Sequence, residues 1–249
     1  MFVFGLMVGS FLNVCIARIP AGESIVRPGS RCPHCRRAIP WYDNIPVLSY
    51  VLLGGRCRNC KTRISPRYVV VEIVTAIAFV VQAWVIGDDP WLLASRLVFT
   101  ALLVALFGTD LETQRLPDPL TFTGLAVGLV GSFWLPPGWQ ASAIGAVLGA
   151  AILLAIRAIW QWLRGVDAMG LGDVKMLAMI GAFLGWRQVL VTLFLSTLAG
   201  AIVGVSIGMA KGSRSMQVRL PFGTFLAVAA YIASLVGEDL LHWYMTLYQ

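Results

Sequence analysis

Charged side chains and histidines are scarce in this sequence. Only 12% of its 249 residues are charged, about half the share of an ordinary soluble domain, whereas 58% are hydrophobic. This composition excludes a soluble globular protein and indicates an integral membrane protein. There is no His-Glu-x-x-His sequence, and a serine triad would need His34 or His242, the only histidines, at its centre. The common metalloprotease and serine hydrolase arrangements are therefore not evident.

Long apolar segments predict an all-α, polytopic membrane protein. Segments of about 16 to 23 residues can cross ~30 Å of hydrocarbon as helices, and the alternating ten-residue segments typical of a membrane barrel are not visible. The first segment lacks the basic start and the cleavage site of a secretory signal, so we expect a retained membrane helix. In all we expect about eight transmembrane helices, at residues 1–17, 68–86, 91–109, 119–135, 139–163, 174–186, 188–210 and 221–240.

The basic residues predict the orientation of these helices. Residues 18–67 form the only sizeable polar segment and hold ten of the 19 lysines and arginines. If this segment is cytoplasmic, the loops near Arg115, Lys175 and Lys211–Arg219 fall on the same side, as the positive-inside rule requires. We attribute the net charge of +7 to this topology and expect no nucleic-acid partner. The expected parts are a first membrane helix, a small cytoplasmic domain and a seven-helix membrane domain, at residues 1–17, 18–67 and 68–249.

Four of the five cysteines form two Cys-x-x-Cys pairs. Each two-residue gap lets two thiolates hold one tetrahedral ion, and a short hairpin can close the 21 residues between the pairs. Four thiolates saturate zinc, so its role would be structural, in a polar segment that has little core of its own. Two disulfides or four free thiols are the alternatives, although cytoplasmic disulfides are disfavoured. The expected zinc ligands are Cys32, Cys35, Cys57 and Cys60.

Two aspartates stand at the edges of apolar segments. Asp110 ends a predicted span, where an ionisable group is costly and is a functional candidate, or else an interfacial carboxylate facing water. Asp173 follows Gly170 and Gly172 and opens a new helix, either as its N-cap or as a site residue. The topology puts both aspartates on the cytoplasmic face, so we expect one two-carboxylate site. Such a pair can share a proton, activate water and polarise a carbonyl, which hydrolyses an amide without a covalent intermediate.

Charges near this pair have plainer interpretations. Asp118 directly precedes Pro119, so we expect it to cap the N-terminus of the next helix. Lys175 is expected to favour the ionised form of Asp173 at a helix N-terminus, which leaves the shared proton on Asp110 at a helix C-terminus.

Two further acids also have structural interpretations. Glu112 lies two positions from Asp110 and would not share its helix face, so we expect it to be solvated or paired with Arg115. Glu72, about one turn inside the second span, is expected to pair with a basic residue such as Arg67.

Several motifs spread over nearly the whole chain occur in a recognisable order. They are Gly9–Val14, Gly22–Ser24, the two Cys-x-x-Cys pairs, Asn44–Tyr50, Asp110–Glu112 with Leu116–Asp118, Gly170–Lys175, Gly181–Gly185 and Pro221–Gly223. In this order they resemble the bacterial prepilin leader peptidases. The Gly-x-Gly-Asp element is also similar to that of presenilin-like proteases, but the combination is specific.

The resemblance implies a membrane aspartic endopeptidase with Asp110 and Asp173 as its catalytic pair. Its substrates would be type IV prepilins and pseudopilins, whose basic leader is removed after a glycine at the cytoplasmic face of the bacterial inner membrane. Family members with such a cysteine domain also methylate the new amino terminus with S-adenosylmethionine, an activity that rests on the resemblance because no glycine-rich cofactor loop is visible. Anionic lipid head groups are the expected partner of the basic domain.

Two other classes of function are compatible with a polytopic protein. A cation transporter would carry charged residues near the middle of its spans, whereas most acids here lie at the predicted rims or in loops. A non-catalytic, zinc-bearing assembly platform for a pilus or secretion machine is the other alternative.

Overall fold

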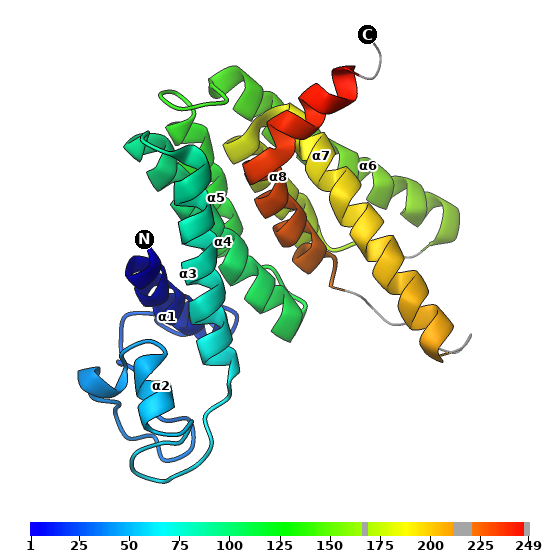
Figure 1. Cartoon of the computed structure of the whole chain (residues 1–249). Coiled ribbons are helices and arrows are strands. Elements are labelled where there is room, and N and C mark those ends of the chain that lie inside the picture. The colour runs from blue at the N-terminus through cyan, green and yellow to red at the C-terminus, as the bar shows by residue number, and fades with distance from the viewer. Residues whose placement is uncertain (166–168, 212–220, 247–249) are drawn as a thin grey trace. The chain divides into compact units, whose positions relative to one another are not determined.

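The computed structural model describes residues 1–165, 169–211 and 221–246, and the described part is helical (Figure 1). Its strand-like pairing is confined to two isolated β-bridges, Arg31 with Ala38 and Arg56 with Arg63. The chain divides into two compact units, residues 1–89 and 90–249. The helices are α1 (Phe2–Arg18), α2 (Leu48–Leu52), α3 (Arg67–Ile86), α4 (Pro90–Thr113), α5 (Asp118–Gly131), α6 (Trp139–Arg164), α7 (Leu171–Lys211) and α8 (Phe222–Thr246), with a short 3-10 turn at Trp41–Asp43.

The first unit is built on the pair of apolar helices α1 and α3. Two glycines of α1 let the two backbones approach closely. A Cβ atom on Gly5 would lie 2.5 Å from the Cα atom of Ala76, and one on Gly9 would lie 2.7 Å from the Cα atom of Glu72. The polar segment between these helices contains α2 and the 3-10 turn.

The second unit contains α4 to α8, with α7 packed along α6 (Figure 1). Glycines again mark the closest approach, since a Cβ atom on Gly145 of α6 would lie 2.7 Å from the carbonyl oxygen of Gly181 in α7. Buried side chains of α4, α7 and α8, including Phe99, Leu177 and Leu226, form the core. This packing holds the end of α4 near the starts of α7 and α8.

Five described helices are long and apolar enough to cross a membrane, namely α3, α4, α6, α7 and α8. Large apolar side chains on their outer surfaces are exposed, as expected for helices surrounded by lipid. The all-α, multi-pass membrane class predicted from composition is therefore confirmed.

The count of eight spans is not confirmed, because α1 and α5 have only 17 and 14 residues. All eight predicted apolar segments overlap helices, but two of them lie in the single element α7. That helix is interrupted at Gly185, whose φ of 79° and ψ of 172° are not helical. Such a φ favours glycine. The basic loop expected at residues 212–219 lies outside the described residues, and the predicted division at residues 17 and 67 stays a prediction.

Candidate functional site

The two aspartates singled out by the sequence occupy unlike helix ends in the second unit. Asp110 lies in the last turn of α4 and is buried, with 5% of its surface exposed. Asp173 lies in the first turn of α7 and is partly buried. The two carboxyl groups are close enough to interact electrostatically. The structure therefore brings together the two residues that the sequence predicted to meet.

Backbone amides at the start of α8 surround the Asp110 carboxylate. The Thr224 N–H donates a hydrogen bond of 2.9 Å to Oδ2 of Asp110, and the Gly223 backbone also faces this group. A Cβ atom on Gly223 would lie 2.8 Å from the same oxygen, so only glycine leaves room for it. The sequence indicated the glycine but not that the α8 N-terminus binds Asp110, because the two segments are 114 residues apart.

Asp173 has fewer donors around it. Its carboxylate accepts a hydrogen bond from the backbone of Gly170, the residue before α7. Asp173 is the third residue of α7, and a carboxylate at this position that binds the backbone of the residue before the helix is part of a capping box. Asp173 therefore caps the helix from its third position and is not the N-cap residue itself. The nearness of Asp110 gives Asp173 a second relationship that a plain capping residue lacks.

The interpretations of Lys175 and Asp118 require correction. Helix α5 begins at Asp118 itself, after Pro117, and has no side-chain cap. The Asp118 carboxylate instead forms a 2.6 Å ion pair with Nζ of Lys175. This ion pair ties the start of α5 to the second turn of α7 and engages the lysine that the sequence analysis assigned to Asp173.

The four paired cysteines of the first unit form one cluster. Their sulfur atoms all lie within 4.8 Å of one another. Sγ of Cys32 is 3.8 Å from Sγ of Cys60, and Sγ of Cys35 is 4.0 Å from Sγ of Cys57. These are free thiols, which excludes the disulfide alternative. Four sulfurs at about 2.3 Å from one tetrahedral ion would be roughly 3.8 Å apart, so the cluster could hold a metal ion.

Each Cys-x-x-Cys pair sits in the same kind of turn. The Cys32 N–H donates to the Arg37 carbonyl over 3.0 Å, and the Cys57 N–H donates to the Thr62 carbonyl over 2.9 Å. The residue after the second cysteine is left-handed in both turns, with φ of 56° at Arg36 and 57° at Lys61. Two equivalent turns thus point two pairs of sulfurs at one centre.

Hydrogen bonds within the cluster distinguish its thiols. The Thr62 hydroxyl, followed by the Thr62 backbone, lowers the pKa of Cys60 to about 6. The Arg37 backbone lowers the pKa of Cys35, but desolvation and the neighbouring sulfurs outweigh it and raise that pKa to about 11. In the metal-free cluster some sulfurs therefore keep protons, which a bound cation would displace.

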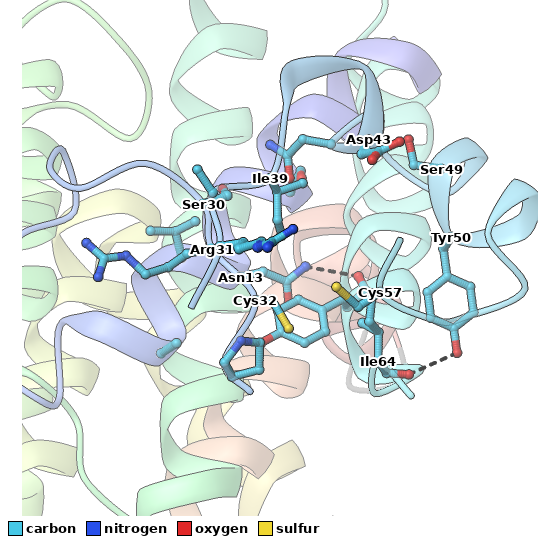
Figure 2. A pocket seen from close by; sticks show the side chains of 18 of the residues that line it. Asn13, Ser30, Arg31, Cys32, Ile39, Asp43, Ser49, Tyr50, Cys57 and Ile64 are labelled. Carbon is cyan, nitrogen blue, oxygen red and sulfur yellow. Dashed lines mark hydrogen bonds between the residues drawn. The ribbon is translucent and has the colours of Figure 1, made fainter. Parts of the chain in front are cut away.

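A cavity of about 1020 Å³, lined by both polar and apolar residues, lies in the first unit beside this cluster (Figure 2). Cys32 and Cys57 are on its wall, and the Tyr50 hydroxyl donates a 3.3 Å hydrogen bond to the Ile64 carbonyl. Asn13 of α1 also lines the cavity and donates to the Tyr68 carbonyl over 2.9 Å. The sequence analysis missed the cavity. Polar residues inside two apolar helices were the available signal.

Glu72 is an acidic residue inside the apolar helix α3. It accepts a 2.8 Å hydrogen bond from the Val47 N–H and also contacts the Ser10 side chain. Arg67, the partner that the sequence predicted, places its guanidinium 5.0 Å from the centre of the Tyr68 ring, and its pairing with Glu72 stays a prediction. Glu72 thus connects a membrane helix to the polar segment.

Comparison with known proteins agrees with the division into two units. Residues 3–86 match the bacterial peptidase A24 N-terminal domain, and residues 97–205 match the type IV leader peptidase family. The prepilin leader peptidase/N-methyltransferase of Aeromonas hydrophila is 36% identical over 98% of this chain and 92% of that protein. The protein of the same description from Pseudomonas aeruginosa is 36% identical over 98% and 91%.

A relative with this description from Myxococcus xanthus is 42% identical over 85% of this chain and 63% of its own length. No solved structure matches the chain. The family models and the relatives together cover both the cysteine cluster and the aspartate pair. The chain therefore belongs to the type IV leader peptidase family.

Proposed function

We propose that this protein is a membrane aspartic endopeptidase that removes the basic leader from type IV prepilins and pseudopilins, after a glycine. The observation that carries the proposal is the nearness of Asp110, at the end of α4, to Asp173, at the start of α7, in a chain related over most of its length to prepilin leader peptidases. A cation transporter or a non-catalytic assembly platform is not favoured by these relatives.

The hydrogen-bond donors around each carboxyl group suggest which aspartate is ionised and which holds the shared proton. Hydrogen bonds from Thr224 and Gly223 suit an ionised Asp110, whereas Asp173, with one backbone donor, suits the shared proton. This assignment reverses the one that the ends of α4 and α7 alone suggested, because the N-terminus of α8 also points at Asp110.

Peptide hydrolysis by this pair follows in two stages. Asp110 takes a proton from water while the water oxygen attacks the scissile carbonyl carbon, and Asp173 gives its proton to the carbonyl oxygen. The resulting diol then collapses as Asp110 protonates the leaving amine and Asp173 recovers its proton. One water is consumed, and both carboxyl groups return to their starting states.

The cysteine cluster fits a structural zinc ion held by Cys32, Cys35, Cys57 and Cys60. The sulfur separations of 3.8 and 4.0 Å are those of a tetrahedral thiolate site, and four protein ligands leave no position for a catalytic water. The ion would stabilise the two turns without taking part in hydrolysis.

We also propose that the protein methylates the new amino terminus, with S-adenosylmethionine supplying the methyl group when bound. The cavity of the first unit has room for a ligand of this kind, since its volume lies at the upper end of the range for small-molecule sites. Carboxylates of Glu23 and Glu72 on its lining complement a sulfonium and an ammonium, and the rings of Tyr50 and Tyr68 can contact an adenine. Labelled cofactor binding, measured directly on the detergent-solubilised protein, tests this assignment.

The proposed location is the bacterial inner membrane, with the aspartate pair at the cytoplasmic face. A prepilin holds an apolar helix in the bilayer and its leader in the cytoplasm, so the scissile bond would lie at this rim. The arginines of the cysteine domain would then contact anionic lipid head groups.

Leader removal from a purified prepilin tests the peptidase directly. We expect cleavage by the wild-type protein and none detectable above background by Asp110→Asn or Asp173→Asn. Glu112→Gln, at an exposed position in the last turn of α4, is the matched control and should cleave. Full cleavage by either aspartate variant would reject the catalytic pair.

A further inference from the structure

Leu116 occupies a special position beside the aspartate pair. It lies in the loop between α4 and α5 and contacts glycines from two other segments. A Cβ atom on Gly172 would lie 2.9 Å from Cβ of Leu116, and one on Gly223 would lie 3.1 Å from Cδ1 of Leu116. Gly172 is next to Asp173, and Gly223 is against Asp110. The Leu116 side chain therefore lies between the segments that carry or bind the two carboxyl groups.

Backbone atoms also lie close to the two carboxyl groups. Gly223 lies against Oδ2 of Asp110. A Cβ atom on Gly170 would lie 3.5 Å from Oδ2 of Asp173. The Thr224 contact with Asp110 is also made by a backbone N–H. Among these contacts Leu116 supplies the apolar side chain, and it is partly buried against the core of the second unit.

The packing of Leu116 against Gly172 and Gly223 has no room for a methyl group on either glycine. A Cβ atom on Gly172 or on Gly223 would lie closer to the leucine than ordinary carbon contacts allow, which are about 3.5 to 4.0 Å. A peptide carbonyl held between the two aspartates has its own Cα one bond away, so any side chain on that residue starts in the same confined region. Glycine alone adds nothing there.

We propose that Leu116 is the residue that restricts the substrate position before the scissile bond to glycine. The inference rests on the proposed peptidase function and adds its specificity determinant. A methyl group on the substrate would meet the leucine side chain, whereas shortening the leucine would create space for it. Leu116 acts by contact with the substrate and takes no part in proton transfer.

A competition between two substrates tests the proposal. One prepilin carries glycine before the scissile bond, the other alanine, and both are cleaved in one reaction whose products are separated by mass. Exclusion of one methyl group is worth about 10- to 200-fold in kcat/KM, so we expect a wild-type preference for glycine in that range. Leu116→Ala should lower the glycine-to-alanine ratio by about tenfold.

The ratio separates a specificity role from a structural one, because loss of folded enzyme lowers both rates equally. Leu120→Ala is the matched control, since Leu120 is also partly buried against the same core, and its ratio should equal that of wild type. A fall of more than about threefold in Leu116→Ala alone supports the proposal; a smaller fall, or an equal fall in the control, overturns it.

If Leu116→Ala has no measurable activity, a second pair of variants with smaller changes tests the proposal instead. Leu116→Met keeps the side-chain volume and Leu116→Val reduces it, so the ratio for valine should fall below that for methionine. Equal ratios would overturn the proposal. If wild-type protein fails to cleave the glycine prepilin at all, the proposed peptidase function fails, which is a different result from cleavage without a shift in preference.

Discussion

Glu72 and Val47 form a hydrogen bond that joins a membrane helix to the polar segment. The Val47 N–H donates to Oε2 of Glu72 over 2.8 Å, and Val47 has φ of 60° and ψ of −51°. A β-branched residue rarely has a positive φ, so surrounding contacts must hold this backbone in place.

Removal of the Glu72 carboxylate should destabilise the first unit. We expect Glu72→Ala to lower the free energy of unfolding by about 1–3 kcal/mol, because the Val47 N–H loses its buried acceptor. Glu72→Gln keeps an acceptor oxygen and should lose less. Thermal unfolding in detergent measures the order wild type, Gln, Ala. An alanine variant as stable as the glutamine variant would contradict the role of this hydrogen bond.

The close approach of α1 to α3 predicts a strong effect of one methyl group. Gly9→Ala would put its Cβ atom 2.7 Å from the Glu72 backbone, so α1 has to move, and we expect a loss of about 1–3 kcal/mol in stability. Gly208→Ala is the control, since nothing lies within 4 Å of its Cβ position on α7. That change should leave the unfolding temperature unaltered or raise it slightly. Similar losses in both variants would argue against tight α1–α3 packing.

Metal analysis tests the cysteine cluster. Wild-type protein should contain about one zinc per chain, and the Cys32→Ser, Cys57→Ser double variant should contain almost none, because two of four ligands are replaced. Cys15→Ser lies outside the cluster and should retain its zinc. Undiminished zinc in the double variant would place the ion elsewhere.

The ion pair between Lys175 and Asp118 predicts that replacing Lys175 does not change the pH dependence of cleavage. Because Lys175 Nζ binds Asp118 at 2.6 Å, Lys175→Met should leave the midpoints of the pH–rate profile for leader cleavage unchanged within about 0.3 units. Stability should fall only slightly, since the Asp118 carboxylate is 57% exposed. A shift of the profile by a full unit would restore the role in poising Asp173 that the sequence suggested.

The sequence was sufficient to single out the candidate site residues. Asp110 and Asp173 stood out because carboxylates are scarce at the ends of apolar segments, and the cysteines stood out by spacing. Local patterns of this kind predict which residues are candidate site residues and at which end of a helix they lie. The structure has Asp110 at the end of α4 and Asp173 in the first turn of α7, close enough to interact electrostatically, and it gathers all four cysteines.

The contacts around these residues could not be predicted in the same way. The donor to Asp110 comes from Thr224, and the partner of Asp118 comes from the second turn of α7, 57 residues away. Helix packing decides such pairs, and no local pattern encodes it. For the same reason the position of Leu116 between Gly172 and Gly223 emerged only from the structure.

The interruption of α7 at Gly185 has a mechanical consequence. It makes Leu171–Leu184, which carries Asp173, a separate rod roughly 20 Å long at 1.5 Å per residue. A rod of this length cannot span ~30 Å of hydrocarbon, so the second part of α7 has to absorb changes in bilayer thickness by tilting. The segment that carries Asp173 can therefore keep its packing within the protein while the second part of α7 changes its tilt.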